Sequence, residues 1–167
     1  MTTDAKRNGR VIVDDGFATL SFERRLLHPI EDVWTAITDP DERRAWLGET
    51  HIEPRVGGAV KIVAHGPPVP PEVRTLTGRV LVWDPPHVLE HTWDQKIIGE
   101  TIARYELSRD GDATLLRFTH RGFRVRAHAG GYGAGMHAYF ERLDAYLANE
   151  PLPDWASRSQ ELAPIYA

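Results

Sequence analysis

The chain has 167 residues, of which 41% are hydrophobic and 26% charged, and it contains no cysteine. This is ordinary globular composition, and the lack of thiols excludes disulfides, cysteine nucleophiles and thiolate metal ligands. A formal net charge of −4 argues against nucleic acid as a partner. The length favours a single domain over residues 1–167, with a core at about 10–149 and a C-terminal tail at 150–167.

The first ten residues are polar and lack the apolar segment of a signal peptide. Nowhere does an apolar run approach the ~20 residues that span a bilayer. We therefore expect a cytoplasmic protein without stable membrane insertion.

A strand is predicted at 17–26, where Leu20 and Phe22 share one face, and a short strand at 10–13 can precede it. Pro29 suits the first turn of a helix. The residues after it place Ile30, Val33, Trp34 and Ile37 on one apolar stripe. A second short helix is expected at 41–46, closed by Gly48.

From residue 60 onward the apolar period changes from 3.6 to 2, which indicates strands. The segments with this alternation are 60–64, 76–83, 88–93, 101–107 and 115–120. The Asp110-Gly111 pair between the last two is a strong hairpin signal. Because the connections are short, neighbouring strands must be antiparallel.

The longest helix is predicted after Gly130-Gly131, since Met136, Phe140, Leu143 and Leu147 are spaced by 4, 3 and 4. The glycine-rich run 130–135 is interpreted as a flexible hinge, and the proline-rich run 66–71 as a loop. Both would border the mouth of a pocket. Beyond the helix, Trp155 and Tyr166 suit a tail that packs back onto the domain.

The order of elements indicates an α+β, helix-grip fold of the START/Bet v-like kind. A twisted antiparallel sheet with one apolar face must cover that face. The long C-terminal helix is the available cover, so the sheet is expected to curve around it, with two short helices after the first long strand.

Several motifs resemble the START-like (SRPBCC) superfamily, and more narrowly the bacterial homologues of the activator of the heat-shock-protein-ninety ATPase. The resemblance covers about residues 17–149. The segments that carry it are Phe22-Glu23-Arg24-Arg25, residues 28–40, Trp46, Gly57-Gly58, Asp84-Pro85-Pro86, residues 89–93, residues 110–123 and His137-Ala138-Tyr139-Phe140.

The resemblance implies binding of lipids, sterols, hormones or polyketides, and in a few members an aromatase or cyclase activity. This chain departs from the pattern at two positions. It has Gly135-Met136 where relatives usually carry Gly-Trp, and its 66–71 loop is unusually rich in proline. Both changes fall where a ligand would enter.

Strand parity predicts an apolar pocket with a few polar groups, the usual form of a small-molecule site. Its expected lining residues are Trp46, Leu89, His91, Trp93, Tyr105, Phe118, His120, Met136 and Phe140. The alternative is that these side chains fill the core. His91 and His120 can donate a hydrogen bond or transfer a proton, or they can be bonded to neighbouring protein groups.

Eight histidines are present, but none forms a helical His-x-x-x-His pair. His87 and His91 on one strand would lie roughly 13 Å apart, too far for one metal ion. No nucleophile-elbow, Walker or dinucleotide motif occurs, so neither metal nor cofactor is expected. The basic stretch 120–128 is interpreted as a solvated loop.

The predicted function is binding of a small hydrophobic or amphipathic molecule between the sheet and the last helix. Two alternatives stay open: a cyclase-like enzyme acting on an aromatic or polyketide substrate, and a chaperone-associated interaction module. A homodimer is a further possibility.

Overall fold

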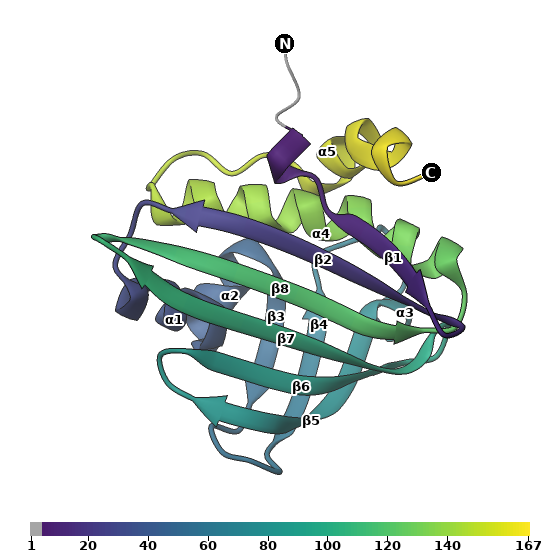
Figure 1. Cartoon of the computed structure of the whole chain (residues 1–167), viewed down its shortest axis with the longest axis horizontal. Helices are drawn as coiled ribbons and strands as arrows, with labels where there is room; N and C mark the ends of the chain where they lie inside the picture. The colour runs from purple at the N-terminus through teal and green to yellow at the C-terminus, as the bar shows by residue number, and fades with distance from the viewer. Residues whose placement is uncertain (1–4) are drawn as a thin grey trace.

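An antiparallel sheet of eight strands curves around a long helix (Figure 1). The computed structural model describes residues 5–167. The strands pair in the order β1-β2-β8-β7-β6-β5-β4-β3. From β3 to β8, each strand therefore pairs with the strand that follows it in the chain. Their bounds are β1 Arg10–Asp14, β2 Phe17–Leu26, β3 Gly48–Ile52, β4 Ala59–Ala64, β5 Thr75–Asp84, β6 Val88–Gln95, β7 Gly99–Asp110 and β8 Ala113–Phe123.

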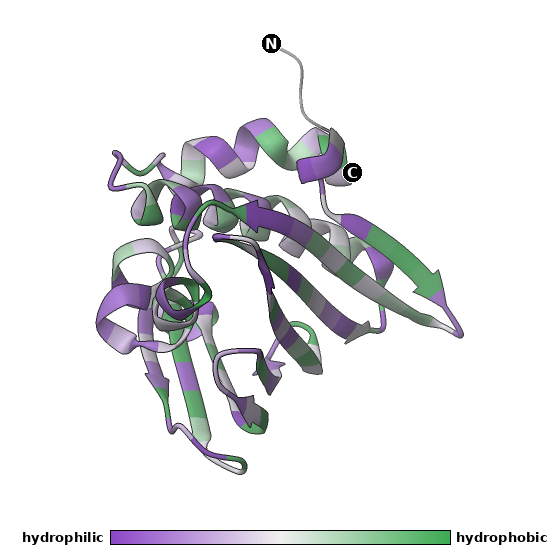
Figure 2. Cartoon of the chain, turned by 60° about the vertical axis from the view of Figure 1, so that its left-hand side comes forward, coloured by the Kyte–Doolittle hydropathy of each residue, from purple (hydrophilic) through white to green (hydrophobic). Residues whose placement is uncertain are grey.

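Alternation along the strands separates a buried face from an exposed one. Hydropathy alternates in the same way, as the green and purple bands along the strands in Figure 2 show. In β2 the buried positions include Ala18, Leu20 and Phe22, each separated by one less buried residue. The Asp110-Gly111 turn is confirmed: Gly111 has φ +62°, which glycine adopts without a Cβ penalty, and β7 pairs with β8 from Asp110↔Ala113 onward.

Strand β3 was not anticipated. It begins at Gly48, opposite Ala64 of β4, immediately after the short helix that this glycine was expected to close. A Cβ at position 48 would lie 2.1 Å from the Val63 carbonyl oxygen, so glycine allows the strand to start there. The segment Gly-Glu-Thr-His-Ile has little apolar alternation and is held by pairing with β4 at the sheet edge.

The helices are α1 Ile30–Thr38, α2 Pro40–Trp46, α3 Pro71–Arg74, α4 Arg126–Leu147 and α5 Trp155–Leu162, with short 3-10 turns η1 Ala5–Arg7 and η2 Ala163–Tyr166. The Asp39 side chain caps α2 by accepting hydrogen bonds from the backbone N–H groups of Asp41 and Glu42. This confirms the two short helices predicted after the first long strand. Within residues 5–167, no helix is both long and apolar enough to cross a bilayer.

Helix α4 begins at Arg126 and contains the whole glycine-rich run, so the hinge predicted at 130–135 is wrong. The glycines make room for the C-terminal turn. A Cβ on Gly130 would lie 2.6 Å from the Tyr166 carbonyl oxygen, and one on Gly133 would lie 2.4 Å from the Tyr166 ring. Tail packing therefore explains Gly130 and Gly133.

The core lies between the sheet and α4. Phe140 of α4 contacts Phe22 of β2 and Phe118 of β8 with ring centroids 5.3 and 5.4 Å apart. On its other side α4 packs against α5 and η2 (Figure 1). The predicted tail packing is confirmed, and the architecture is the helix-grip fold expected from the sequence.

Candidate ligand-binding site

A cavity of about 420 Å³ remains between the sheet and α4. This volume lies in the range of small-molecule sites. Side chains from β2, β4 to β8, α2, α4 and α5 contribute to its wall, which is mostly apolar. Its aliphatic lining is Leu20, Leu47, Ile62, Leu76, Ile98 and Met136.

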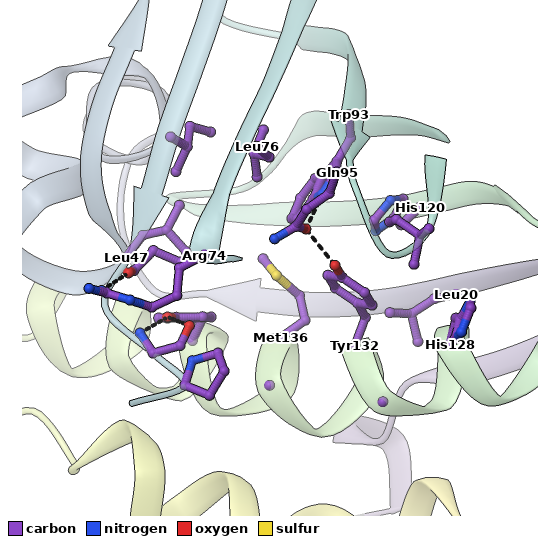
Figure 3. Close-up of a pocket in the computed structure, with 18 of the residues that line it drawn as sticks. Leu20, Leu47, Arg74, Leu76, Trp93, Gln95, His120, His128, Tyr132 and Met136 are labelled. Carbon is purple, nitrogen blue, oxygen red and sulfur yellow. Dashed lines mark hydrogen bonds between the residues drawn. The ribbon is translucent and has the colours of Figure 1, made fainter. Parts of the chain in front are cut away.

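One wall of the cavity is aromatic (Figure 3). Trp93 donates its indole N–H to Gln95 Oε1 at 3.0 Å, and the Tyr132 hydroxyl donates to the same oxygen. The rings of Trp93 and Tyr132 meet edge to face at 5.8 Å. The Gln95 amide thus joins β6 to α4, and Met136 lies one helical turn beyond Tyr132 on the same side of α4.

The mouth of the cavity is bordered by the 66–71 loop and by α5. The Tyr139 hydroxyl accepts a hydrogen bond from the Gly66 N–H at 3.0 Å, and its ring stacks on Trp155 at 5.3 Å. Trp155 in turn donates its indole N–H to the Gly135 carbonyl at 2.9 Å. Arg74 ties the loop to the sheet by donating to the Val69 and Ala64 carbonyls at 3.0 and 2.6 Å.

His120 presents a hydrogen-bond acceptor to the cavity. Its Nε2 lies 2.7 Å from Thr101 Oγ1, and that hydroxyl donates its proton to the Trp93 carbonyl. His120 Nε2 must therefore be the donor to Thr101, which leaves the lone pair of the neutral ring on Nδ1. Burial, with a smaller contribution from nearby His91, lowers the pKa of His120 to about 3, so the ring is neutral at pH 7.

His91 lies in the core behind the cavity wall. Its Nδ1 donates to the Thr92 carbonyl at 2.8 Å, and within residues 5–167 its Nε2 has no hydrogen-bond partner. Burial lowers the pKa of His91 to about 4, and the positive charge of Arg43 acts in the same direction.

Arg43 is a buried cation on α2, with 1% of its surface exposed. Its Nη2 donates to the Tyr105 hydroxyl at 3.2 Å, and its guanidinium lies 5.6 and 5.8 Å from the ring centres of Tyr105 and Trp46. Among the described residues, no partner is found for its Nε and Nη1. No aspartate or glutamate appears in the cavity wall described by the structure.

Four of the nine residues predicted for the pocket line this cavity: Trp93, Tyr105, His120 and Met136. The other five are buried in the core around it and do not line it: Trp46, Leu89, His91, Phe118 and Phe140. Trp46 joins the two short helices, donating its indole N–H to the Ala36 carbonyl at 2.9 Å. Ligand contact by any of the nine stays a prediction.

Sequence reasoning missed several lining residues that carried a usable signal. Arg43 lies three positions before Trp46 and therefore shares its buried helical face. Tyr132 lies four positions before Met136 on α4, and Gln95 has the same strand parity as Trp93. A charged or polar residue on a face that is otherwise apolar was the signal in each case.

The basic stretch 120–128 is not a solvated loop throughout. Its first four residues belong to β8, where His120 and Phe123 are both buried because the pairing with β2 shifts register between them. Arg121 faces outward and forms an ion pair with Glu90 at 3.6 Å. Across residues 5–167, no group of three or more His, Asp or Glu side chains is placed to hold a metal ion.

The curved sheet, the long helix and the apolar cavity between them define a helix-grip domain. Residues 27–148 match the family described as Activator of Hsp90 ATPase homolog 1-like protein, and the chain belongs to this family. A search of the curated proteins finds no match.

Solved bacterial structures share the fold. Protein MLL2253 from Mesorhizobium loti is 29% identical, with 80% of this chain and 99% of that one covered and a TM-score of 0.70. The BPP1335 protein from Bordetella parapertussis is 27% identical, covering 99% and 94%, with a TM-score of 0.73. CalU16 from Micromonospora echinospora is 24% identical, covering 95% and 92%, also with a TM-score of 0.73.

Proposed function

We propose that this protein binds a small hydrophobic or amphipathic molecule in the cavity between the sheet and α4. The observation that carries the proposal is the cavity itself, about 420 Å³ with a mostly apolar wall. Empty apolar space destabilises a folded protein, by about 24 cal/mol per Å³ in mutated cores. A domain that keeps a cavity of this size is best explained by a ligand that fills it.

The histidines favour binding over proton transfer. A general base works best when its pKa lies near the working pH, whereas burial lowers the pKa of His120 to about 3. The ring is suited to accept a hydrogen bond from a ligand hydroxyl at Nδ1. The cyclase-like enzyme is therefore the weaker alternative, and the chaperone-associated module, the homodimer and the cytoplasmic location stay predictions.

Native mass spectrometry of the purified protein, followed by solvent extraction, tests the proposal. We expect an apolar passenger at one per chain, or, for protein purified empty, saturable binding of the neutral fluorescent probe phenylnaphthylamine. A clean apo mass together with no probe binding and no thermal shift across a lipid and aromatic library would overturn it.

A further inference from the structure

The cavity carries positive charge without a compensating anion. Arg43 and Arg74 both contribute to its wall, and the wall described by the structure contains no aspartate or glutamate. We infer that the ligand is a ring-containing apolar molecule with one anionic oxygen group, a carboxylate or sulfonate, received by Tyr105 and Arg43. This inference rests on the proposed function and specifies the class of ligand.

Arg43 is the less compensated of the two arginines. It is 1% exposed, and within residues 5–167 it forms no ion pair, while Nε and Nη1 have no partner. Burying a charge is costly unless an opposite charge or a full set of hydrogen bonds offsets the lost hydration. The rings of Tyr105 and Trp46 offset part of this cost, and an anionic ligand would supply the rest.

Tyr105 is placed to connect that charge to the ligand. Its hydroxyl oxygen accepts from Arg43 Nη2 at 3.2 Å, and no acceptor for its own proton is found among the described residues. Tyr105 lines the cavity, so its O–H is free to donate to a ligand oxygen there. A donor that is itself bound to a cation favours an anionic acceptor.

Arg74 is bonded to the protein backbone instead. Its Nε and Nη1 donate to the Val69, Ala64 and His65 carbonyls, which fixes the loop at the mouth. The Arg74 donors are thus bonded to backbone carbonyls, whereas Nε and Nη1 of Arg43 have no hydrogen-bond partner among the described residues. The anionic end of the ligand is therefore assigned to the Arg43–Tyr105 side of the cavity.

The remaining wall suits the rest of such a molecule. Trp93, Tyr132, Tyr139 and Trp155 present aromatic surface against which a flat ring can pack. His120 Nδ1 offers an acceptor for a ligand hydroxyl, as derived above from its bond to Thr101. The aromatic wall thus favours a ligand with a ring system, and Arg43 favours a ligand with a negative charge.

A matched pair of fluorescent probes tests the inference. Anilinonaphthalene sulfonate and phenylnaphthylamine share one aromatic skeleton, and the sulfonate is the difference between them. We expect the wild type to bind the sulfonate at least about tenfold more tightly, because a hydrogen bond to a charged group contributes more than a neutral one. Arg43→Met and Tyr105→Phe should each reduce this preference, measured as the ratio of the two probe affinities, to about twofold or less. Arg74→Gln removes the other cation of the wall and tests the placement of the anionic end: it should keep the ratio of the two affinities, because Arg74 donates to backbone carbonyls.

The outcomes separate the two proposals. If neither probe binds, the proposed function fails, and the inference with it. If both bind equally, or if the preference survives in both Arg43→Met and Tyr105→Phe, the inference fails while the proposed function stands. A preference lost in Arg74→Gln and kept in Arg43→Met would overturn the placement of the anionic end. Circular dichroism checks folding, and if Arg43→Met does not fold, Tyr105→Phe decides alone because it removes one hydroxyl.

Discussion

At the scale of single residues, Met136 is one of the side chains that limit the space in the cavity. It lines the wall and is 6% exposed. A thioether side chain is narrow and flexible and adapts to ligands of irregular shape, whereas an indole would project into the same space.

Met136→Trp should fill part of the cavity. We expect phenylnaphthylamine affinity to fall by at least about tenfold, since a blocked pocket forfeits apolar burial worth more than 1.4 kcal/mol, while the melting temperature stays the same or rises. Fluorescence titration and a thermal melt measure both quantities. Met136→Leu, similar in volume, serves as the control and should bind nearly as well as the wild type. Full binding by the tryptophan variant would contradict the assigned role.

The buried histidines make stability depend on pH. Burial lowers the pKa of His91 to about 4 and of His120 to about 3, from an ordinary value of 6.5. Above pH 6.5 both rings are neutral in the folded and unfolded chains, so protonation of these histidines does not lower the free energy of unfolding. As the pH falls below 6.5, the two histidines become protonated in the unfolded chain but stay neutral in the folded one, because their folded pKa values are lower. The free energy of unfolding therefore decreases.

Urea unfolding at pH 7 and pH 5 should show this loss. Each histidine contributes at most about 2 kcal/mol between pH 6.5 and pH 5, at 1.4 kcal/mol per proton and pH unit. His120→Gln should lower the difference between the two pH values, whereas His51→Gln, at an exposed position, should leave it unchanged. A free energy of unfolding that is equal at pH 5 and pH 7 would show that the rings are not held neutral.

At the scale of elements, α4 combines a poor intrinsic helix composition with close packing. Four of the eight residues from Ala129 to Met136 are glycines, at positions 130, 131, 133 and 135, and glycine costs a helix about 1 kcal/mol relative to alanine. The helix persists because its neighbours cover it, with Tyr166 against Gly133 and Trp155 against Gly135. Tertiary contact outweighs propensity here.

Two alanine substitutions in α4 should have opposite effects. At Gly131 an added Cβ meets nothing within 4 Å, so Gly131→Ala should stabilise the protein by up to about 1 kcal/mol. At Gly133 the Cβ would lie 2.4 Å from the Tyr166 ring, so Gly133→Ala should destabilise it by about 1–3 kcal/mol through overpacking. Urea unfolding of the pair measures the difference. Equal shifts in one direction would mean that the tail does not pack as described.

Elements with a regular apolar pattern were the ones that the sequence predicted. Strands β4 to β8 were predicted from the alternation of apolar and polar residues, and helices α1 and α2 from helical spacing of apolar residues and from their end signals. Strand β3 and the first turn of α4 were missed, since neither has such a pattern. Both lie beside glycines that let another segment approach closely, which is β4 at Gly48 and η2 at Gly130 and Gly133.

At the scale of the whole molecule, the tail completes the site. Trp155 lies outside the family match at 27–148, yet it lines the cavity, stacks on Tyr139 and contacts Gly66. It therefore joins α5, α4 and the 66–71 loop at one point of the mouth. We therefore expect access to the cavity to depend on all three segments.

Trp155→Ala should open the mouth. We expect phenylnaphthylamine to dissociate several-fold faster, because opening the mouth lowers the barrier to exit and affinity changes arise mostly in the off-rate, together with a lower melting temperature. Stopped-flow fluorescence measures the rate. Trp83→Ala is the matched control: Trp83 packs on Trp34 at 5.2 Å and does not line the cavity. It should lower stability and leave the dissociation rate unchanged. A similar rate change in both variants would argue against a mouth at Trp155.

The sequence by itself determined the fold class, the order of most elements and the apolar character of the space between sheet and helix. These properties depend on local periodicity and on turn residues, which are legible in consecutive positions. Strand parity also identified Trp93, Tyr105 and His120 as inward-facing, and helical spacing identified Met136. These patterns did not distinguish them from Leu89, Phe118 and Phe140, which face inward equally but pack into the core.

Only the tertiary structure decided where the space lies and which groups border it. A cavity is the volume that packing leaves unfilled, so it depends on the joint placement of the sheet, α4, the 66–71 loop and the tail. The pairing of Arg43 with Tyr105 and the closure by Trp155 join residues 62 and 20 or more positions apart in the chain. Such contacts leave no periodic trace in the sequence, because they arise from where whole elements pack.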